Sequence, residues 1–446
     1  MRGNRILFSG GIRPASVFVR DGRILRIGDK GANPSDCTVF DAGDSVVMPG
    51  LVDSHVHINE PGRTEWEGFD SATRAAAAGG VTALVDMPLN SIPATTSREA
   101  LLEKIRAAEG RCWVDIGFWG GAVPGNTDHL RPLSAAGARG FKCFLISSGV
   151  EEFAPVSEED LRSSLPVLAG MGATLLAHAE LPGPIEQATR ELRRRPGCDP
   201  RVYNTFLQSR PKQAENEAIS LLIRLCREFR CPIHIVHLSS AEALPNLRDA
   251  RKEGLSISVE TCPHYLCLVA EEIPDGATEF KCCPPIRERK NCEQLWDGLR
   301  EGIIDMIVSD HSPCPPQMKS RDTGDFLSAW GGISSLQFRL TLVWTEAQRR
   351  GFSLEQVSAW LAEAPARLAG LAGRKGSIRE GYDADFVVWD PEENFSIEPE
   401  RIFHRHKLTP YAGRQFRGTI RATFLRGQLV YDRGKFVEGP NGQLLV

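Results

Sequence analysis

Short apolar segments alternate with helical segments between residues 51 and 310, and this alternation limits the fold more than any other feature. Strands that alternate with helices pair in parallel, and eight such units spanning about 250 residues close into a barrel. We therefore expect an α/β fold, a (β/α)8 TIM-like barrel. The predicted strands are 51–58, 81–88, 113–120, 139–146, 172–179, 231–238, 255–262 and 304–310, and the predicted helices include 65–78, 97–109, 157–170, 213–229 and 241–253.

The two ends of the chain show a different pattern, with short β-rich pieces and turn glycines. We expect residues 1–50 and 375–446 to be the N-terminal and C-terminal parts of one small composite β-sandwich domain, which flanks a barrel of residues 51–374. The connections 181–230 and 311–353 exceed the usual length of a βα loop, and long loops over the barrel mouth are where a substrate lid would lie.

Composition excludes several classes of function. The net charge of −4 gives no basic surface for nucleic acid, and no apolar run approaches the roughly 20 residues of a membrane span. The first residues lack the apolar core of a signal peptide, and the twelve cysteines have no paired Cys-x-x-Cys spacing, as in reduced cytosolic proteins. We expect a soluble cytoplasmic protein with a small-molecule substrate and neither nucleic acid nor membrane as partner. The arginine cluster 190–195 is either a solvated helix face or an anion site.

Polar side chains stand at the ends of five predicted strands, where a barrel collects its catalytic residues. Residues two apart on a strand share a face, so the first strand presents two adjacent imidazoles. Taken singly, each has an ordinary explanation: Lys142 could be an exposed cation, His178 a hydrogen-bonded core histidine, and Asp310 the N-cap of a following turn. Together these polar side chains would meet at the mouth of the barrel with no group there to compensate their burial, and this favours a metal site. The candidate ligands are His55, His57, Lys142, His178, His237 and Asp310.

Three further histidines compete for roles at this site. His234 and His237 lie three apart on one strand and should face opposite sides, so we assign His237, nearer the strand end, as the ligand and His234 to packing. His311 follows Asp310 and should point away from it. His264 either supports the ligands or faces the substrate.

The segment Gly50–His57, the lysine, the two later histidines and Ser309–Pro313 resemble the cyclic amidohydrolases of the amidohydrolase superfamily. The resemblance covers nearly the whole chain, including Gly376–Phe386, which is similar to that family's return into the small β domain. It implies that CO₂ carboxylates Lys142, because an ammonium group has only donors and cannot bind a cation.

This N6-carboxylysine would bridge two divalent metal ions, one with His55, His57 and Asp310 and the other with His178 and His237. Zn²⁺ suits these ligands best, with Mn²⁺, Co²⁺ and Fe²⁺ as alternatives. The ions would hold a bridging hydroxide and polarise the scissile carbonyl, and Asp310 would also be the general base.

The residues around the ligands indicate the substrate. Dihydroorotases carry an arginine where Asn59 stands, and that arginine holds a carboxylate, so Asn59 favours a neutral substrate. The segments 60–69, 87–96, 283–287, 309–319 and 329–333 resemble allantoinases. The resemblance implies hydrolysis of the hydantoin ring of allantoin to allantoate in purine and ureide catabolism.

Substrate contacts are expected from backbone and side chains of the long loops. Ser147 stands where dihydropyrimidinases and hydantoinases carry a tyrosine that stabilises the oxyanion, so here that task would rest more on the metal. Cys283 stands where we expect a serine. If this residue contacts the substrate through its backbone, cysteine in place of serine changes little. If the side chain makes the contact, the substrate specificity could differ from that of allantoinases. The candidates are Asn59, Ser147, Cys283, Ser312, Trp330, Gly331 and Gly332, with lid packing as an alternative for Trp330.

Two other functions stay open at this point. One is a hydantoinase or dihydropyrimidinase. The other is a non-catalytic scaffold protein of the dihydropyrimidinase type, although all six ligand positions are retained. Relatives commonly form tetramers, so a homotetramer is expected.

Overall fold

The eight predicted barrel strands are confirmed in the computed structural model, which describes residues 1–32, 37–437 and 439–446. One parallel sheet joins β5, β6 and β7, and a second joins β8 to β13 in chain order. The strands are β5 (Leu51–Val56), β6 (Val81–Asp86), β7 (Asp115–Phe118), β8 (Gly120–Gly121), β9 (Phe141–Phe144), β10 (Leu175–His178), β11 (Ile233–Ile235), β12 (Ile257–Thr261) and β13 (Met306–Ile307).

The third barrel strand changes partner at Trp119, between β7 and β8. The Trp119 N–H donates to the Asp86 carbonyl oxygen, whereas the next N–H, of Gly120, donates to Gly140, each at 2.9 Å. A parallel bridge between Val56 and His311 joins the last strand to the first. These contacts close the two sheets into one barrel.

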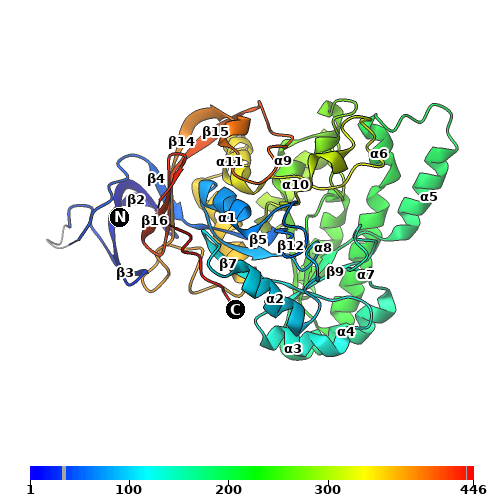
Figure 1. Ribbon diagram of the computed structural model, residues 1–446, viewed down its shortest axis with the longest axis horizontal. Helices are drawn as coiled ribbons and strands as arrows, with labels where there is room; N and C mark the ends of the chain where they lie inside the picture. Colours follow the sequence, from blue (N-terminus) through cyan, green and yellow to red (C-terminus); the bar gives the residue numbers. More distant parts are fainter. Residues whose placement is uncertain (33–36, 438) are drawn as a thin grey trace.

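Helices cover the outside of the barrel (Figure 1). Helix α4 shows why they form here, because Ser157 and Asp160 make a capping box at its start and Gly172 ends it at φ 64°. None of the helices in the described ranges is both long and apolar enough to cross a membrane. They are α1 (Phe69–Ala78), α2 (Arg98–Ala108), α3 (Leu130–Ala135), α4 (Glu158–Met171), α5 (Pro182–Arg193), α6 (Tyr203–Ser209), α7 (Lys212–Phe229), α8 (Leu244–Lys252), α9 (Pro263–Cys267), α10 (Arg289–Arg300), α11 (Arg339–Arg349), α12 (Leu354–Ser358) and α13 (Ala364–Leu368).

The long connection 181–230 contains α5, α6 and α7, and α5 extends far from the barrel (Figure 1). The arginines at 190 and 193–195 of this connection are exposed. They form the solvated face that the sequence offered as one interpretation. The cysteines from 112 to 314 are free thiols, as predicted.

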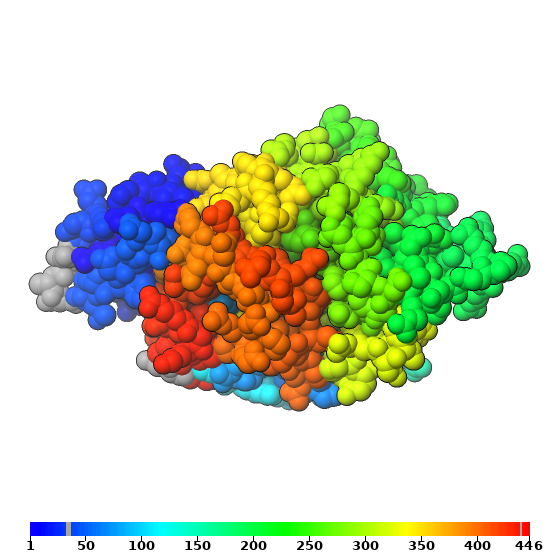
Figure 2. Space-filling model, turned by 90° about the horizontal axis from the view of Figure 1, so that it is seen from above, coloured from blue at the N-terminus to red at the C-terminus, as the bar shows by residue number. Residues whose placement is uncertain are grey.

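Strands from both ends of the chain form one small β domain, as predicted, and they lie in a single hydrogen-bonded sheet. The order is β17-β16-β15-β14-β4-β1-β2-β3, and β4 joins the halves by pairing with β1 and β14. Figure 2 shows the blue N-terminal residues beside the orange and red C-terminal ones. The strands are β1 (Arg2–Phe8), β2 (Gly11–Arg20), β3 (Arg23–Gly28), β4 (Val46–Pro49), β14 (Phe386–Ser396), β15 (Gln415–Leu425), β16 (Gln428–Asp432) and β17 (Lys435–Phe436).

A buried charge cluster fastens this sheet to the barrel. The Lys375 Nζ atom lies 2.6 Å from Asp115 at the start of β7, and 2.9 and 2.6 Å from Asp383 and Asp385 before β14. Burial alone would lower the pKa of Lys375, but the three carboxylates raise it. The ammonium group therefore occupies the centre of these acids.

Removing this ammonium group should destabilise the protein. In Lys375→Met the three carboxylates lose the ammonium group that they share. Asp115 keeps Arg426 and Asp383 keeps Arg374 as ion-pair partners, but Asp385 is left buried without a counter-charge among the described residues, so the free energy of unfolding should fall by about 3–5 kcal/mol. Urea denaturation measures the change. Lys252→Met, at an exposed lysine, is the matched control and should stay within about 0.5 kcal/mol of the parent protein. Equal stability of the two variants would show that the cluster does not hold the domains together.

Candidate metal centre

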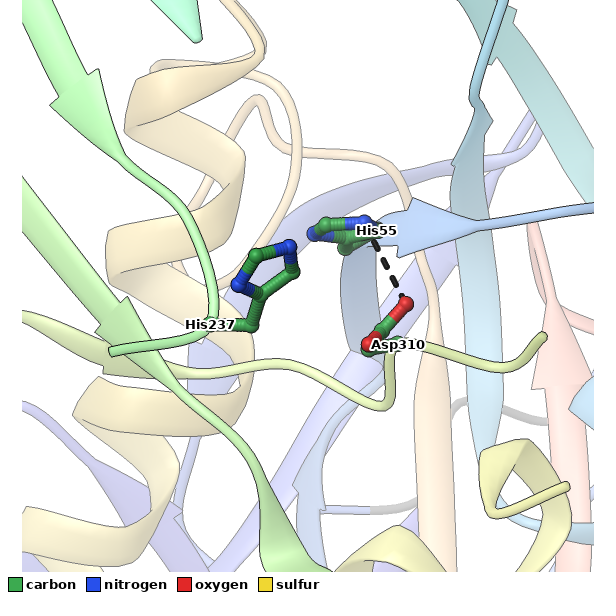
Figure 3. Close-up of side chains that lie close together, drawn as sticks. All are labelled: His55, His237 and Asp310. Atoms are coloured by element: carbon green, nitrogen blue, oxygen red, sulfur yellow. Dashed lines mark ion pairs between the residues drawn. The ribbon is translucent and has the colours of Figure 1, made fainter. Parts of the chain in front are cut away.

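The six predicted ligands converge at the C-terminal ends of the barrel strands, and all six are buried. The Asp310 Oδ1 atom lies 3.3 Å from His55 Nε2 and 3.6 Å from His57 Nε2. On the other side, His178 Nδ1 faces His237 Nε2 at 3.0 Å. Figure 3 shows His55, His237 and Asp310 pointing toward one another, His55 from a strand and the other two from loops. One ligand atom from each of these three lies within 4.8 Å of the others.

The local backbone explains how residues beyond the strands reach this point. Lys142 and His178 belong to β9 and β10, but His237 and Asp310 follow the ends of β11 and β13. Both of these residues adopt positive φ, 39° for His237 and 43° for Asp310. Residues other than glycine rarely take this conformation, and it is found where function requires a side chain to be turned.

Several buried polar atoms of the cluster lack a partner within the described residues. They are Lys142 Nζ, His57 Nδ1 and His237 Nδ1. Buried polar groups normally form hydrogen bonds, and an unpaired one is costly. The facing ring nitrogens of His55, His57, His178 and His237 and the Asp310 carboxylate form a compact set of donors, and Lys142 adds a buried group with no partner among the described residues, so the residues present fit a metal.

The electrostatics favour the protonation states that a metal requires. Burial lowers the pKa of His57 to about 4 and also lowers the pKa values of His178 and His237, so these imidazoles are neutral at pH 7. Burial opposes ionisation of Asp310, but the neighbouring histidines hold its pKa well below the usual value. Burial also lowers the pKa of Lys142 to about 8, so part of its population is uncharged.

Two buried glutamates that the sequence analysis missed hold the histidines. On β12, Glu260 accepts from His55 Nδ1 at 2.5 Å and from His234 Nε2 at 2.9 Å. Glu180 lies 2.8 Å from His178 Nε2 and also binds Arg210. Such carboxylates select the tautomer of a ligating imidazole. Glu180 could have been found from the sequence, because it stands two residues after the predicted ligand His178.

The other histidines divide between support and packing. His234 does more than pack, since it links Glu260 to the Ser258 hydroxyl at 2.7 Å. His311 bonds Glu67 at 3.2 Å and so points away from the cluster, as predicted. His264 is fully buried and lies near Asp310, but it does not line the cavity described next.

A cavity of about 250 Å³ opens directly over the cluster. Six of the seven predicted substrate contacts line it: Ser147, Cys283, Ser312, Trp330, Gly331 and Gly332. Further lining residues were not predicted from the sequence, among them Asn90, Phe144, Arg210 and Lys281.

Asn59 differs from its predicted position. Its side chain is fully buried, donates to the Pro313 carbonyl oxygen at 3.4 Å, and does not line the cavity. The residue adopts φ 68°, so the chain turns sharply after the two histidines and directs Asn59 toward the loop after β13.

Comparisons with known proteins agree with this geometry. Residues 46–430 match the family model of the amidohydrolase family. The allantoinase of Streptomyces avermitilis is 49% identical over 100% of this chain and 98% of its own. The allantoinase of Saccharomyces cerevisiae is 45% identical over 99% of this chain and 97% of its own. Among solved structures, an L-hydantoinase (dihydropyrimidinase) from Arthrobacter aurescens has 30% identity and a TM-score of 0.93, covering 99% of this chain and 98% of that one.

Proposed function

The chain belongs to the amidohydrolase family, and from that premise we infer that it is an allantoinase, which hydrolyses the cyclic amide of allantoin to allantoate. The observation that carries the inference is the convergence of four histidines, one aspartate and an unpartnered buried lysine beneath one cavity. The full-length similarity to allantoinases from bacteria, yeast and plants supports the choice of substrate.

We propose that Lys142 is carboxylated and that the site holds two divalent ions, with Zn²⁺ favoured over Mn²⁺, Co²⁺ or Fe²⁺. His55, His57 and Asp310 would hold one ion, and His178 and His237 the other. When bound, the ions would supply a water activated at neutral pH and a Lewis acid for the carbonyl. The unpaired Nζ of Lys142 and the neutral imidazoles support this assignment.

Asp310 has the properties of the general base. Its carboxylate is ionised at pH 7, and the Ser312 hydroxyl donates to its Oδ1 atom at 2.7 Å, which holds that oxygen in place. It would accept a proton from the attacking water and deliver it to the departing amide nitrogen. Ser147 lines the cavity and can donate to the developing oxyanion.

A substrate panel tests the assignment. With bicarbonate and Zn²⁺, Mn²⁺ or Co²⁺ present, allantoin should be hydrolysed with a higher kcat/KM than hydantoin or dihydrouracil. Faster hydrolysis of dihydrouracil would move the protein to the dihydropyrimidinases, the second candidate, which the likeness to the L-hydantoinase structure favours. Fewer than one metal ion per chain after metal-supplemented expression would favour a scaffold instead.

Glu260 should control how tightly the metal is held. In Glu260→Gln, His55 loses the carboxylate that fixes its tautomer, so metal affinity should fall by about 10–100-fold. Competition with a chromogenic chelator measures the loss. Glu242→Gln, at an exposed glutamate, is the control and should bind metal like the parent protein. Unchanged affinity in Glu260→Gln would contradict a supporting role for this residue.

Further features of the assembly belong to the same proposal. We propose that residues 51–374 form the catalytic domain, with 1–50 and 375–446 as the two halves of the β domain. We also propose a homotetramer in the cytoplasm, and light scattering of the purified protein would determine its mass in solution.

A further inference from the structure

Lys319 is a buried cation held only by backbone oxygens. It is 4% exposed, and its Nζ atom donates to the carbonyl oxygens of Lys281 at 3.1 Å, Trp330 at 3.0 Å and Gly332. Within the described residues no carboxylate lies at ion-pair distance from it. Burying an ammonium group without a counter-charge is costly. The arrangement therefore needs a reason beyond packing.

The oxygens that Lys319 binds belong to the cavity wall. Lys319 ends a short 3-10 turn, Pro316–Lys319, and reaches the loop at 281–283 and the lid segment 329–332. The same Lys281 carbonyl also accepts from the Gly332 N–H at 2.9 Å. Lys319 thus joins three separate loops at the point where two of them face the cavity.

A second ammonium group strengthens the same wall. The Lys281 Nζ atom donates to the carbonyl oxygens of Leu327 at 3.1 Å and Ala329 at 2.5 Å. Two cations therefore bind five carbonyl oxygens. Four belong to residues that line the cavity, 281, 329, 330 and 332, and the fifth belongs to residue 327 beside it. We call Lys319 and Lys281 the lysine clamp.

The clamp determines which way the wall's amide groups point. In a trans peptide the C=O and the following N–H point in opposite directions. Because the Trp330 carbonyl is turned toward Lys319, the Gly331 N–H is turned away from it. Gly331 lines the cavity, and its N–H has no hydrogen-bond acceptor anywhere in the described ranges. It is a free donor on the cavity wall.

We propose that Lys319 is a positioning residue: it turns the Gly331 N–H into the cavity, where this N–H donates to a carbonyl oxygen of the substrate outside the bond that is cleaved. The proposal rests on the proposed function only for the identity of that substrate, allantoin. Because this hydrogen bond is the same before and during the reaction, its loss weakens binding without slowing the chemical step.

Lys319→Met keeps the length and apolar stem of the side chain and removes the ammonium group. The KM for allantoin should rise about tenfold, the value of one hydrogen bond to a neutral acceptor, while kcat stays within about twofold. Lys252→Met, at an exposed lysine, is the matched control, and its KM and kcat should equal those of the parent protein.

A purely structural role gives a different result. It would lower the melting temperature and the fraction of active molecules, and so the apparent kcat, but leave KM within about twofold. That outcome overturns the proposal. If Lys319→Met does not fold, Lys319→Leu, which also removes every donor, is judged by the same KM criterion. Failure of both to fold also overturns it. A parent protein inactive on allantoin refutes the proposed function instead, so the two failures are distinguishable.

Discussion

Lys142→Ala should abolish allantoin hydrolysis, with kcat lower by about three orders of magnitude or more, while the chain stays folded. The side chain is fully buried, and its Nζ atom has no hydrogen-bond partner within the described residues, so its removal breaks no existing bond. What is lost is the group that, in the proposed assignment, would bridge the two metal ions. Steady-state rates, metal analysis and thermal melting of the same preparation measure the three effects.

Lys290→Ala, at an exposed lysine, is the control and should match the parent protein in all three measurements. Full activity in metal-replete Lys142→Ala would refute the assignment of this lysine.

The same lysine predicts a pH dependence of activation. CO₂ reacts with the uncharged amine, and burial lowers the pKa of Lys142 to about 8. Below that value the uncharged fraction grows about tenfold per pH unit. At a constant concentration of dissolved CO₂, activation of metal-free protein with Zn²⁺ should therefore become faster as the pH rises from 6 toward 8. An activation rate that does not change over this range would contradict the role.

Asp310→Asn should lower kcat by about 10²–10⁴-fold. The amide has nearly the shape of the carboxylate but cannot accept the proton of the attacking water. Metal content should fall less than activity, because the four histidines and Lys142 remain. Ser312→Ala removes only the hydroxyl that holds the Asp310 Oδ1 atom, and it should reduce kcat by about tenfold or less. An Asp310→Asn protein within tenfold of the parent rate would exclude Asp310 as the base.

The barrel was predictable from the sequence because its strands are local features. Each is a short apolar run, and their order follows from the rule that βα units pair in parallel. The pairing of β4 with β14 could not be predicted, because 46–49 and 386–389 lie far apart in the chain and nothing local specifies their register. The change of partner at Trp119 also depends on neighbours that the sequence does not reveal.

The metal ligands were predictable for a similar reason, since five of the six lie near or just beyond the end of a strand, and Lys142 lies within β9. Glu260 was missed because it lies within β12, and its role depends on His55 and His234 from other strands. Asn59 was placed in the cavity, but its positive φ turns it toward Pro313. Lys319 was missed because backbone carbonyls leave no pattern in a sequence.

The most direct measurement is a titration of metal-free protein with Zn²⁺, in the presence of bicarbonate, while allantoin hydrolysis is followed. We expect no turnover without metal, a rise in rate with added Zn²⁺, and a plateau at two ions per chain. Full turnover by the metal-free protein, or no turnover of allantoin at any metal content, would contradict the proposed function.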